Sequence, residues 1–196
     1  MTKDIQLSDS DGVFLVKTAR MAVTEFLSNG KRMKLESERE KKFSFNAGVF
    51  VTLNNADGLR GCIGFPMPDK KLSHGIIDAA IAAATEDPRF SPVKTNELND
   101  IVFKVTVLTP PVEITVTDPM EYLEKIKVGR DGLIIRNSFS SGLLLPQVPV
   151  EYGWNVEEFL QHTCEKAGLE KDTWKNEKVK IEKFEGIVYK EKTNGS

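Results

Sequence analysis

Apolar residues recur every three or four positions along residues 10–29, a spacing that predicts an amphipathic helix ended by Gly30. The Ala-rich segment 72–86 favours a second helix, and two prolines that follow it prevent its continuation. A third helix is predicted over 155–167, and a shorter one over 118–127. The segments between these helices follow a different pattern.

Six of those segments are rich in β-branched and other apolar residues, and each predicts a strand. They are 49–53, 59–65, 100–108, 133–136, 143–145 and 178–190. Turn-forming residues at 54–58 (NNADG) join the first two strands, which predicts a β-hairpin. Strands and helices are mixed without a regular βαβ rhythm. We therefore expect an α+β fold with largely antiparallel sheets and packed helices.

The length of the chain allows two small lobes, and no low-complexity linker divides it. We expect a single domain over residues 1–190 that is made of two lobes, the smaller one over about 58–108. Residues 191–196 are expected to form a disordered tail.

The composition narrows the class of protein. The chain has 196 residues and a mass of 21.9 kDa, with 40% hydrophobic and 29% charged residues, which excludes a membrane-embedded or a disordered protein. The net charge of -2 and the pI of 5.8 show none of the overall basic excess of nucleic-acid-binding proteins. Residues 31–42 do carry a net +3, from six basic and three acidic residues. They predict either a solvated loop or an electrostatic patch, and nucleic-acid binding there is the weakest functional hypothesis.

The two cysteines, Cys62 and Cys164, lie far apart and belong to no CxxC pair, which favours free thiols over a disulfide framework. The N-terminal residues lack the apolar segment of a signal peptide. The longest nearly apolar stretch, 76–84, is too short to span a bilayer and includes Asp78. We therefore expect a soluble, cytoplasmic protein with no membrane partner.

The most informative chemistry lies in residues 59–64 (LRGCIG). In a strand, alternate side chains share a face, so Arg60 and Cys62 are expected on one face and Gly61 on the other. A guanidinium beside a thiol favours the thiolate, which makes Arg60 and Cys62 candidate catalytic residues. Gly61 and Gly64 are expected to leave space around the thiol and are candidates for ligand binding. The alternative is that Cys62 is a small buried apolar residue.

Residues 59–64 also resemble the signature of the AMMECR-one domain family. Further blocks that resemble the family follow in the same order: DPRFSP (87–92), VLTP (107–110), VGRDGL (128–133), LLPQVPVEYGW (144–154) and KAGL (166–169). The resemblance covers nearly the whole chain, from the first helix to the last strand. This chain has Pro149 where the family block often has Ala, a change that alters the loop but removes no chemical group.

The resemblance implies a two-lobed α+β fold with a cleft between the lobes, near the signature, whereas the activity of the family is not established. Some family domains occur beside a radical S-adenosylmethionine enzyme and a dioxygenase-like Memo protein, which suggests a shared pathway. We therefore expect Cys62 to lie in the cleft of a cysteine-dependent enzyme or enzyme component. The alternative is a non-catalytic module that binds a small molecule or a peptide and acts with a partner enzyme.

Three further residues are candidates for ligand binding. Asp87 and Arg89 follow the predicted end of the second helix, where they either line the cleft and bind an anionic or polar ligand or form an ion pair that fixes the turn. Glu151 is a candidate carboxylate partner for Arg60, with a surface position as the alternative.

A thiol nucleophile needs a base, and the chain offers two histidines, His74 and His162, either of which is a candidate. A metal site is not expected, because His162 and Cys164 are too sparse a ligand set and point apart on a helix. The sequence also lacks a phosphate-binding or dinucleotide fingerprint, so no cofactor is predicted.

Overall fold

The structure is a computed structural model that describes residues 7–176 and 179–192. The chain divides into two compact units. Unit 1 comprises the chain up to Leu108 and again from Ile187, and unit 2 comprises Thr109–Gly186. One strand, β7 (Lys180–Lys190), runs from unit 2 into unit 1.

Unit 1 contains three α-helices, α1 (Asp9–Asn29), α2 (Ser37–Lys42) and α3 (Leu72–Thr85), and the 3-10 helix η1 (Thr95–Asp100). Its strands are β1 (Val49–Asn55), β2 (Gly58–Phe65), β3 (Val102–Leu108) and the end of β7. The strand order is β2-β1-β3-β7, and β1 pairs antiparallel with both β2 and β3.

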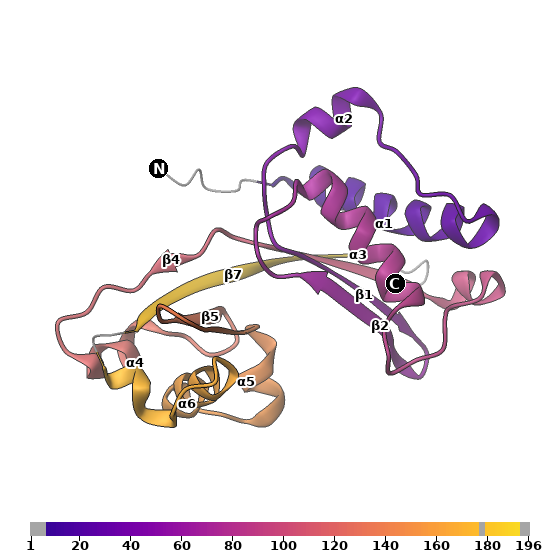
Figure 1. The fold of residues 1–196 in the computed structure, drawn as a ribbon. Helices are drawn as coiled ribbons and strands as arrows, with labels where there is room; N and C mark the ends of the chain where they lie inside the picture. Colours follow the sequence, from indigo (N-terminus) through magenta and orange to yellow (C-terminus); the bar gives the residue numbers. More distant parts are fainter. Residues whose placement is uncertain (1–6, 177–178, 193–196) are drawn as a thin grey trace. The chain divides into compact units, whose positions relative to one another are not determined.

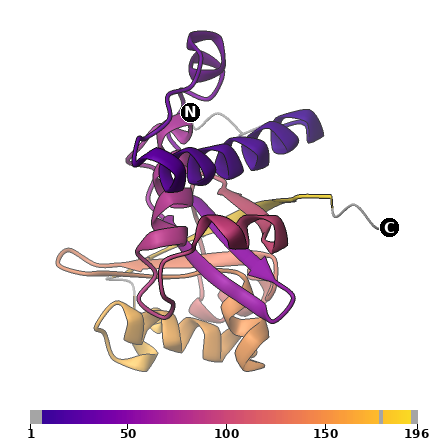
Figure 2. The same cartoon turned by 90° about the vertical axis from the view of Figure 1, so that its right-hand side faces the viewer.

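The two long helices lie on one side of the β1–β2 hairpin (Figure 1, Figure 2). Alternate residues of β1 and β3 are buried beneath them, namely Val49, Val51, Leu53, Phe103, Val105 and Val107. This alternation is the pattern of a sheet with one face on an apolar core. The local signals agree: Ser8 and Asp11 form a capping box that begins α1, and Gly30 ends it at a positive φ of 70°.

Unit 2 contains α4 (Tyr122–Lys125), α5 (Gln147–Tyr152) and α6 (Val156–Lys166), with the 3-10 helices η2 (Pro119–Glu121) and η3 (Lys171–Lys175). Its strands are β4 (Val112–Glu113), β5 (Asp131–Arg136), β6 (Ser141–Leu144) and the first part of β7. β5 pairs antiparallel with β6 and β7, and β4 pairs with β7. Leu133, Ile135, Phe159, Leu160 and Trp174 form the centre of its core.

The expected α+β class, with antiparallel sheets and packed helices, is confirmed. The predicted hairpin and the three predicted long helices form, and Asn155 caps α6 through a reciprocal pair of hydrogen bonds with Glu158. Two helices arise where none was expected: α2, in the charged segment 31–42, and α5. No helix in the described part of the chain is long and apolar enough to cross a membrane.

The expected lobes stay a prediction, and the chain divides into the two compact units. Residues 58–108 do not stand alone but share one apolar core with α1 and β1, because both long helices pack together over the same sheet. At the other end, Arg20 forms hydrogen bonds to Glu191, with Nε–Oε1 2.5 Å and Nη2–Oε2 2.7 Å, and the disordered tail stays a prediction. Residues 193–196 lie outside the described residues. The interlobe cleft stays a prediction.

Candidate functional site

The face on which Cys62 lies is fixed by its neighbour Gly61. A Cβ atom at Gly61 would come within 2.1 Å of the Ala83 carbonyl oxygen, so β2 approaches α3 too closely there for any side chain. Ile63, the next residue on this face, packs against the core. Cys62 therefore projects from the opposite face, which α3 does not cover.

The thiol of Cys62 has one side-chain neighbour across the hairpin. Thr52 lies opposite Cys62 in the β1–β2 ladder, and its Oγ1 is 3.3 Å from Sγ. Thr52 is only 8% exposed, while Cys62 is a half-buried free cysteine. The Cys62 thiol therefore contacts the Thr52 hydroxyl and is partly accessible to solvent.

Asp87 joins Cys62 to Arg89. Its Oδ2 accepts the backbone N–H of Cys62 at 2.8 Å, and both carboxylate oxygens accept the Arg89 guanidinium, with Nε–Oδ1 3.0 Å and Nη2–Oδ2 2.7 Å. The Arg89 guanidinium holds the pKa of the buried Asp87 carboxyl well below its usual range, so Asp87 is a carboxylate. Cys62 interacts electrostatically with Arg89. Arg89, and not Arg60, is thus the arginine that is linked to Cys62, through the Asp87 carboxylate.

This arrangement follows from how α3 ends. The helix stops before Pro88, and the Asp87 carbonyl accepts the N–H of Phe90 in a turn. Asp87 Oδ1 also accepts the backbone N–H of Arg89 at 3.1 Å, which fixes the turn from within. Of the two roles weighed for Asp87 and Arg89, the structure shows the ion pair that fixes the turn, and their role in ligand binding stays a prediction.

Arg60 is placed differently from the expected alternation. The β1–β2 register shifts between Leu53, which pairs with Gly61, and Asn54, which pairs with Leu59, so Arg60 is an extra residue in β2. Its guanidinium forms two hydrogen bonds to Glu97, at 2.8 and 3.1 Å, and one to the Ser91 carbonyl at 2.9 Å. The Arg60 side chain is 12% exposed, and its hydrogen bonds lower the pKa of Glu97.

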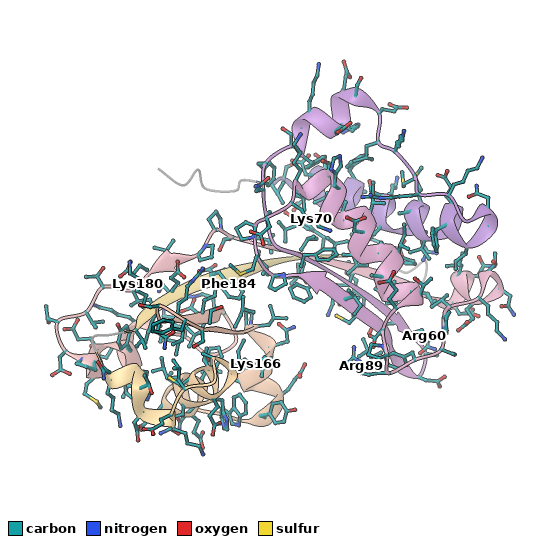
Figure 3. All side chains as sticks on the ribbon, viewed as in Figure 1. Arg60, Lys70, Arg89, Lys166, Lys180 and Phe184 are labelled. Carbon is teal, nitrogen blue, oxygen red and sulfur yellow. The ribbon has the colours of Figure 1, made fainter. Side chains whose placement is uncertain are left out.

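Arg60 and Glu97 also line a surface pocket of about 440 Å³ with Phe90, Ser91, Lys94 and Asn96. Arg60 and Arg89 both lie toward the turn of the β1–β2 hairpin (Figure 3). The loop that follows α3 thus supplies Asp87 as the partner of Arg89, and the 3-10 helix η1 supplies Glu97 as the partner of Arg60.

The glycines beside Cys62 do not leave open space. The space beside Gly61 holds the backbone of α3, and a Cβ at Gly64 would lie 2.4 Å from the Phe50 ring. Phe50 covers Gly64 on the same face as Cys62. These glycines permit close packing around the thiol, and their role in ligand binding stays a prediction.

Both candidate bases have partners of their own. His74, the sole histidine in the unit 1 sequence, contacts Glu40, with Nε2···Oε1 3.1 Å, from the first turn of α3. His162 stacks on Trp154 with ring centroids 3.9 Å apart and contacts Glu165. His162 and the exposed Glu151 belong to unit 2, whereas Cys62 belongs to unit 1. Their proposed roles toward Cys62 and Arg60 stay predictions.

Within residues 7–176 and 179–192, no group of three or more His, Cys, Asp or Glu side chains could hold a metal ion. The charged segment 31–42 is partly neutralised, because Lys42 pairs with Asp11 and Arg32 pairs with Asp78. These ion pairs reduce the surface potential on which nucleic-acid binding there would depend.

Sequence reasoning missed Thr52, Phe50 and Glu97. The signal for Thr52 was the hairpin itself, since its register decides which β1 residue faces Cys62. Glu97 is distant from Arg60 in sequence, and no local pattern links them.

Comparisons with known proteins agree with this fold. The model of the AMMECR1 family matches residues 16–189. Protein MJ0810 of Methanocaldococcus jannaschii is 51% identical over 187 residues, which cover 94% of this chain and 92% of that protein. Protein MK0488 of Methanopyrus kandleri is 48% identical, over 95% of this chain and 91% of that protein.

A solved structure shows the same architecture. The crystal structure of uncharacterized protein PH0010 from Pyrococcus horikoshii matches with a TM-score of 0.82 and 48% identity, over 96% of this chain and 95% of that chain. An identity near one half over almost the whole length, together with the family match, leaves one conclusion. The chain belongs to the AMMECR1 family.

Proposed function

We propose that this protein is a cysteine-dependent enzyme, or the cysteine-bearing component of one, that acts on an anionic substrate. The observation that carries the proposal is the shared carboxylate of Asp87, which accepts the Cys62 N–H and the Arg89 guanidinium together. It links the Asp87–Arg89 ion pair to the backbone of Cys62, and we infer that the guanidinium acts on the thiol from there. Thiolates are the nucleophilic form of cysteine, and a nearby cation stabilises them.

Arg89 also has a group available to bind the substrate. Its hydrogen bonds to Asp87 use Nε, Nη2 and the backbone N–H, and its side chain is 55% exposed. The Nη1 group forms no hydrogen bond to the described residues. A carboxylate or phosphate of the substrate bound there would place a neighbouring electrophilic carbon near Sγ.

The proposed chemical step is a displacement at that carbon. The Cys62 thiol gives its proton to solvent, and the thiolate electron pair forms an S–C bond as the leaving group departs with its own electron pair and takes a proton from water. Thr52 Oγ1 donates a hydrogen bond to the thiolate, and Asp87 stays ionised and holds Arg89. Water or a second substrate then attacks the same carbon, and the S–C bond breaks with its electron pair returning to sulfur, which restores the Cys62 thiolate.

A second candidate function is a binding module, and the histidine contacts favour it. His74 pairs with Glu40, and His162 stacks on Trp154, so each imidazole has a partner of its own. In this version Cys62 is a wall residue, Arg89 anchors an anionic ligand, and chemistry is performed by a partner enzyme.

Alkylation kinetics separate the two functions. The rate of iodoacetamide labelling at Cys62 is measured at neutral pH by peptide mass spectrometry, with glutathione as the free-thiol reference. We expect Cys62 to react faster than glutathione and Arg89→Gln to slow it several-fold, whereas Arg60→Gln leaves the rate within about twofold. A Cys62 that reacts more slowly than glutathione, or a rate indifferent to Arg89→Gln, overturns the enzyme proposal and leaves the binding module.

A further inference from the structure

Unit 1 contains a second pocket, of about 380 Å³, which is lined by α3, by the segment that precedes α2 and by Glu40 of α2. His74 and Ile77, one helical turn apart, supply its α3 wall. Cys62 projects from the sheet face that α3 does not cover, so this pocket is separate from the thiol site. Its walls include part of the segment 31–42.

The interior of the pocket is apolar. Ile77 is 3% and Met33 8% exposed, and Leu35 is half-buried against the same core. A cavity of this size lined by aliphatic and thioether side chains favours the apolar body of a small ligand. The volume is at the lower end of the range of small-molecule sites.

The rim carries one acidic side chain, Glu40, which contacts His74, and it carries more cations than anions. Arg32 pairs with Asp78 at 2.6 Å, but the same carboxylate also accepts Lys70 at 3.1 Å, so one negative charge is shared by two cations. Lys34 is exposed, and no acidic residue in the described part of the chain forms an ion pair with it. An anionic group at the rim is therefore favoured.

The backbone does not supply this anion site. The amides that begin α3 are already paired: Leu72 donates to the Phe45 carbonyl, Ser73 to the Phe43 carbonyl and Gly75 to the Lys71 carbonyl. Recognition must therefore come from the side chains of Lys34 and Arg32. One unpaired and one half-neutralised cation suit a singly charged carboxylate better than a multiply charged phosphate ester.

We propose that this pocket binds a small amphipathic carboxylate. Its carboxylate contacts Lys34 and Arg32 at the rim, and its apolar chain packs against Met33, Leu35 and Ile77. The site is independent of the proposed chemistry at Cys62, and it gives the charged segment 31–42 a role in ligand recognition.

Two probes with the same chain and opposite charge test the proposal: octanoate and octylammonium, each below its micelle concentration. Binding is followed on the full chain by ¹H–¹⁵N correlation spectra and by calorimetry. We expect octanoate to shift the resonances of Leu35, His74 and Ile77, and we expect octylammonium to bind at least threefold more weakly. Equal binding of both probes, no binding of octanoate, or shifts confined to other residues overturns the proposal.

Two lysine variants test whether the positive charge of Lys34 binds the carboxylate of octanoate. Lys34→Gln is expected to weaken octanoate binding about threefold, whereas Lys31→Gln, an exposed lysine outside the pocket lining, leaves it unchanged. Both substitutions are on the surface, and matching thermal unfolding curves show that the variants are folded. Identical octanoate affinities for Lys34→Gln and the unaltered chain also overturn the proposal.

Discussion

The hydroxyl oxygen of Thr52 lies 3.3 Å from the sulfur of Cys62, across the ladder that pairs β1 with β2. The contact exists because an extra residue in β2, Arg60, shifts the register by one position. A single bulge thus sets the partner of the thiol and also directs the Arg60 guanidinium toward Glu97.

Thr52→Val removes this hydroxyl without changing the shape of the side chain. We expect Cys62 alkylation at neutral pH to slow about threefold, because the thiolate loses a hydrogen bond. Thr106→Val, on the half-buried face of β3, is the matched control and should leave the rate unchanged. A faster reaction in Thr52→Val would show instead that the Thr52 hydroxyl accepts a hydrogen bond from the Cys62 thiol and thereby favours its protonated form.

Gly61→Ala tests the close approach of β2 to α3. The new Cβ would come within 2.1 Å of the Ala83 carbonyl oxygen, and neither backbone can yield easily, so we expect a loss of about 2–3 kcal/mol in the free energy of unfolding. The control is Gly75→Ala on α3 itself, where the Cβ meets only Val49 Cγ1, at 3.1 Å, and helix propensity improves. Denaturant unfolding of both variants provides the comparison, and equal losses would refute the backbone clash.

Much of this fold could be predicted because its signals are local. Turn chemistry at residues 54–58 predicts the β1–β2 hairpin, and Gly30 and Asn155 mark helix ends that the structure confirms. The register of the hairpin could not be predicted in the same way. Counted back from Asn55 and Gly58 without a bulge, Thr52 would face Gly61 rather than Cys62.

The candidate site shows the same limit of local reasoning. The alternation rule placed Arg60 with Cys62, but a bulge interrupts the alternation, and the partner of Arg60 is Glu97, 37 residues away. Asp87 and Arg89 were identified from a turn signal, yet only the tertiary packing of that turn against β2 brings them to the thiol. Glycines on either side of a residue are compatible both with close packing and with open space around it. Only the tertiary structure distinguishes the two cases.

The stability of the Asp87–Arg89 pair depends on pH in a direction that can be worked out. The folded state holds the Asp87 pKa below the ordinary value of 3.8, so the pair contributes fully above that value and its contribution is lost as the pH falls below it. We expect Asp87→Asn to lower stability at neutral pH by about 2 kcal/mol, since a charged hydrogen-bond partner is lost. Its unfolding midpoint should also fall less steeply between neutral and acidic pH than that of the unaltered chain.

Asp118→Asn is the control for this measurement, because Asp118 is an exposed carboxylate that caps η2. Its acid dependence should match that of the unaltered chain. If the unfolding midpoints of the unaltered chain and Asp87→Asn fall in parallel as the pH is lowered, protonation of Asp87 does not contribute to the loss of stability in acid.

Cys164 gives the opposite dependence, at alkaline pH. It is fully buried in the core of unit 2, and burial raises the pKa of its thiol from 9.0 to about 11. The folded state therefore holds the thiol proton more tightly than the unfolded chain, and stability is lost as the pH rises through this range. We expect the unfolding midpoint of Cys164→Ala to vary less over that range than the midpoint of the unaltered chain. The same burial predicts that iodoacetamide labels Cys164 only when denaturant unfolds the protein; labelling of Cys164 in the native state at the rate of Cys62 would contradict it.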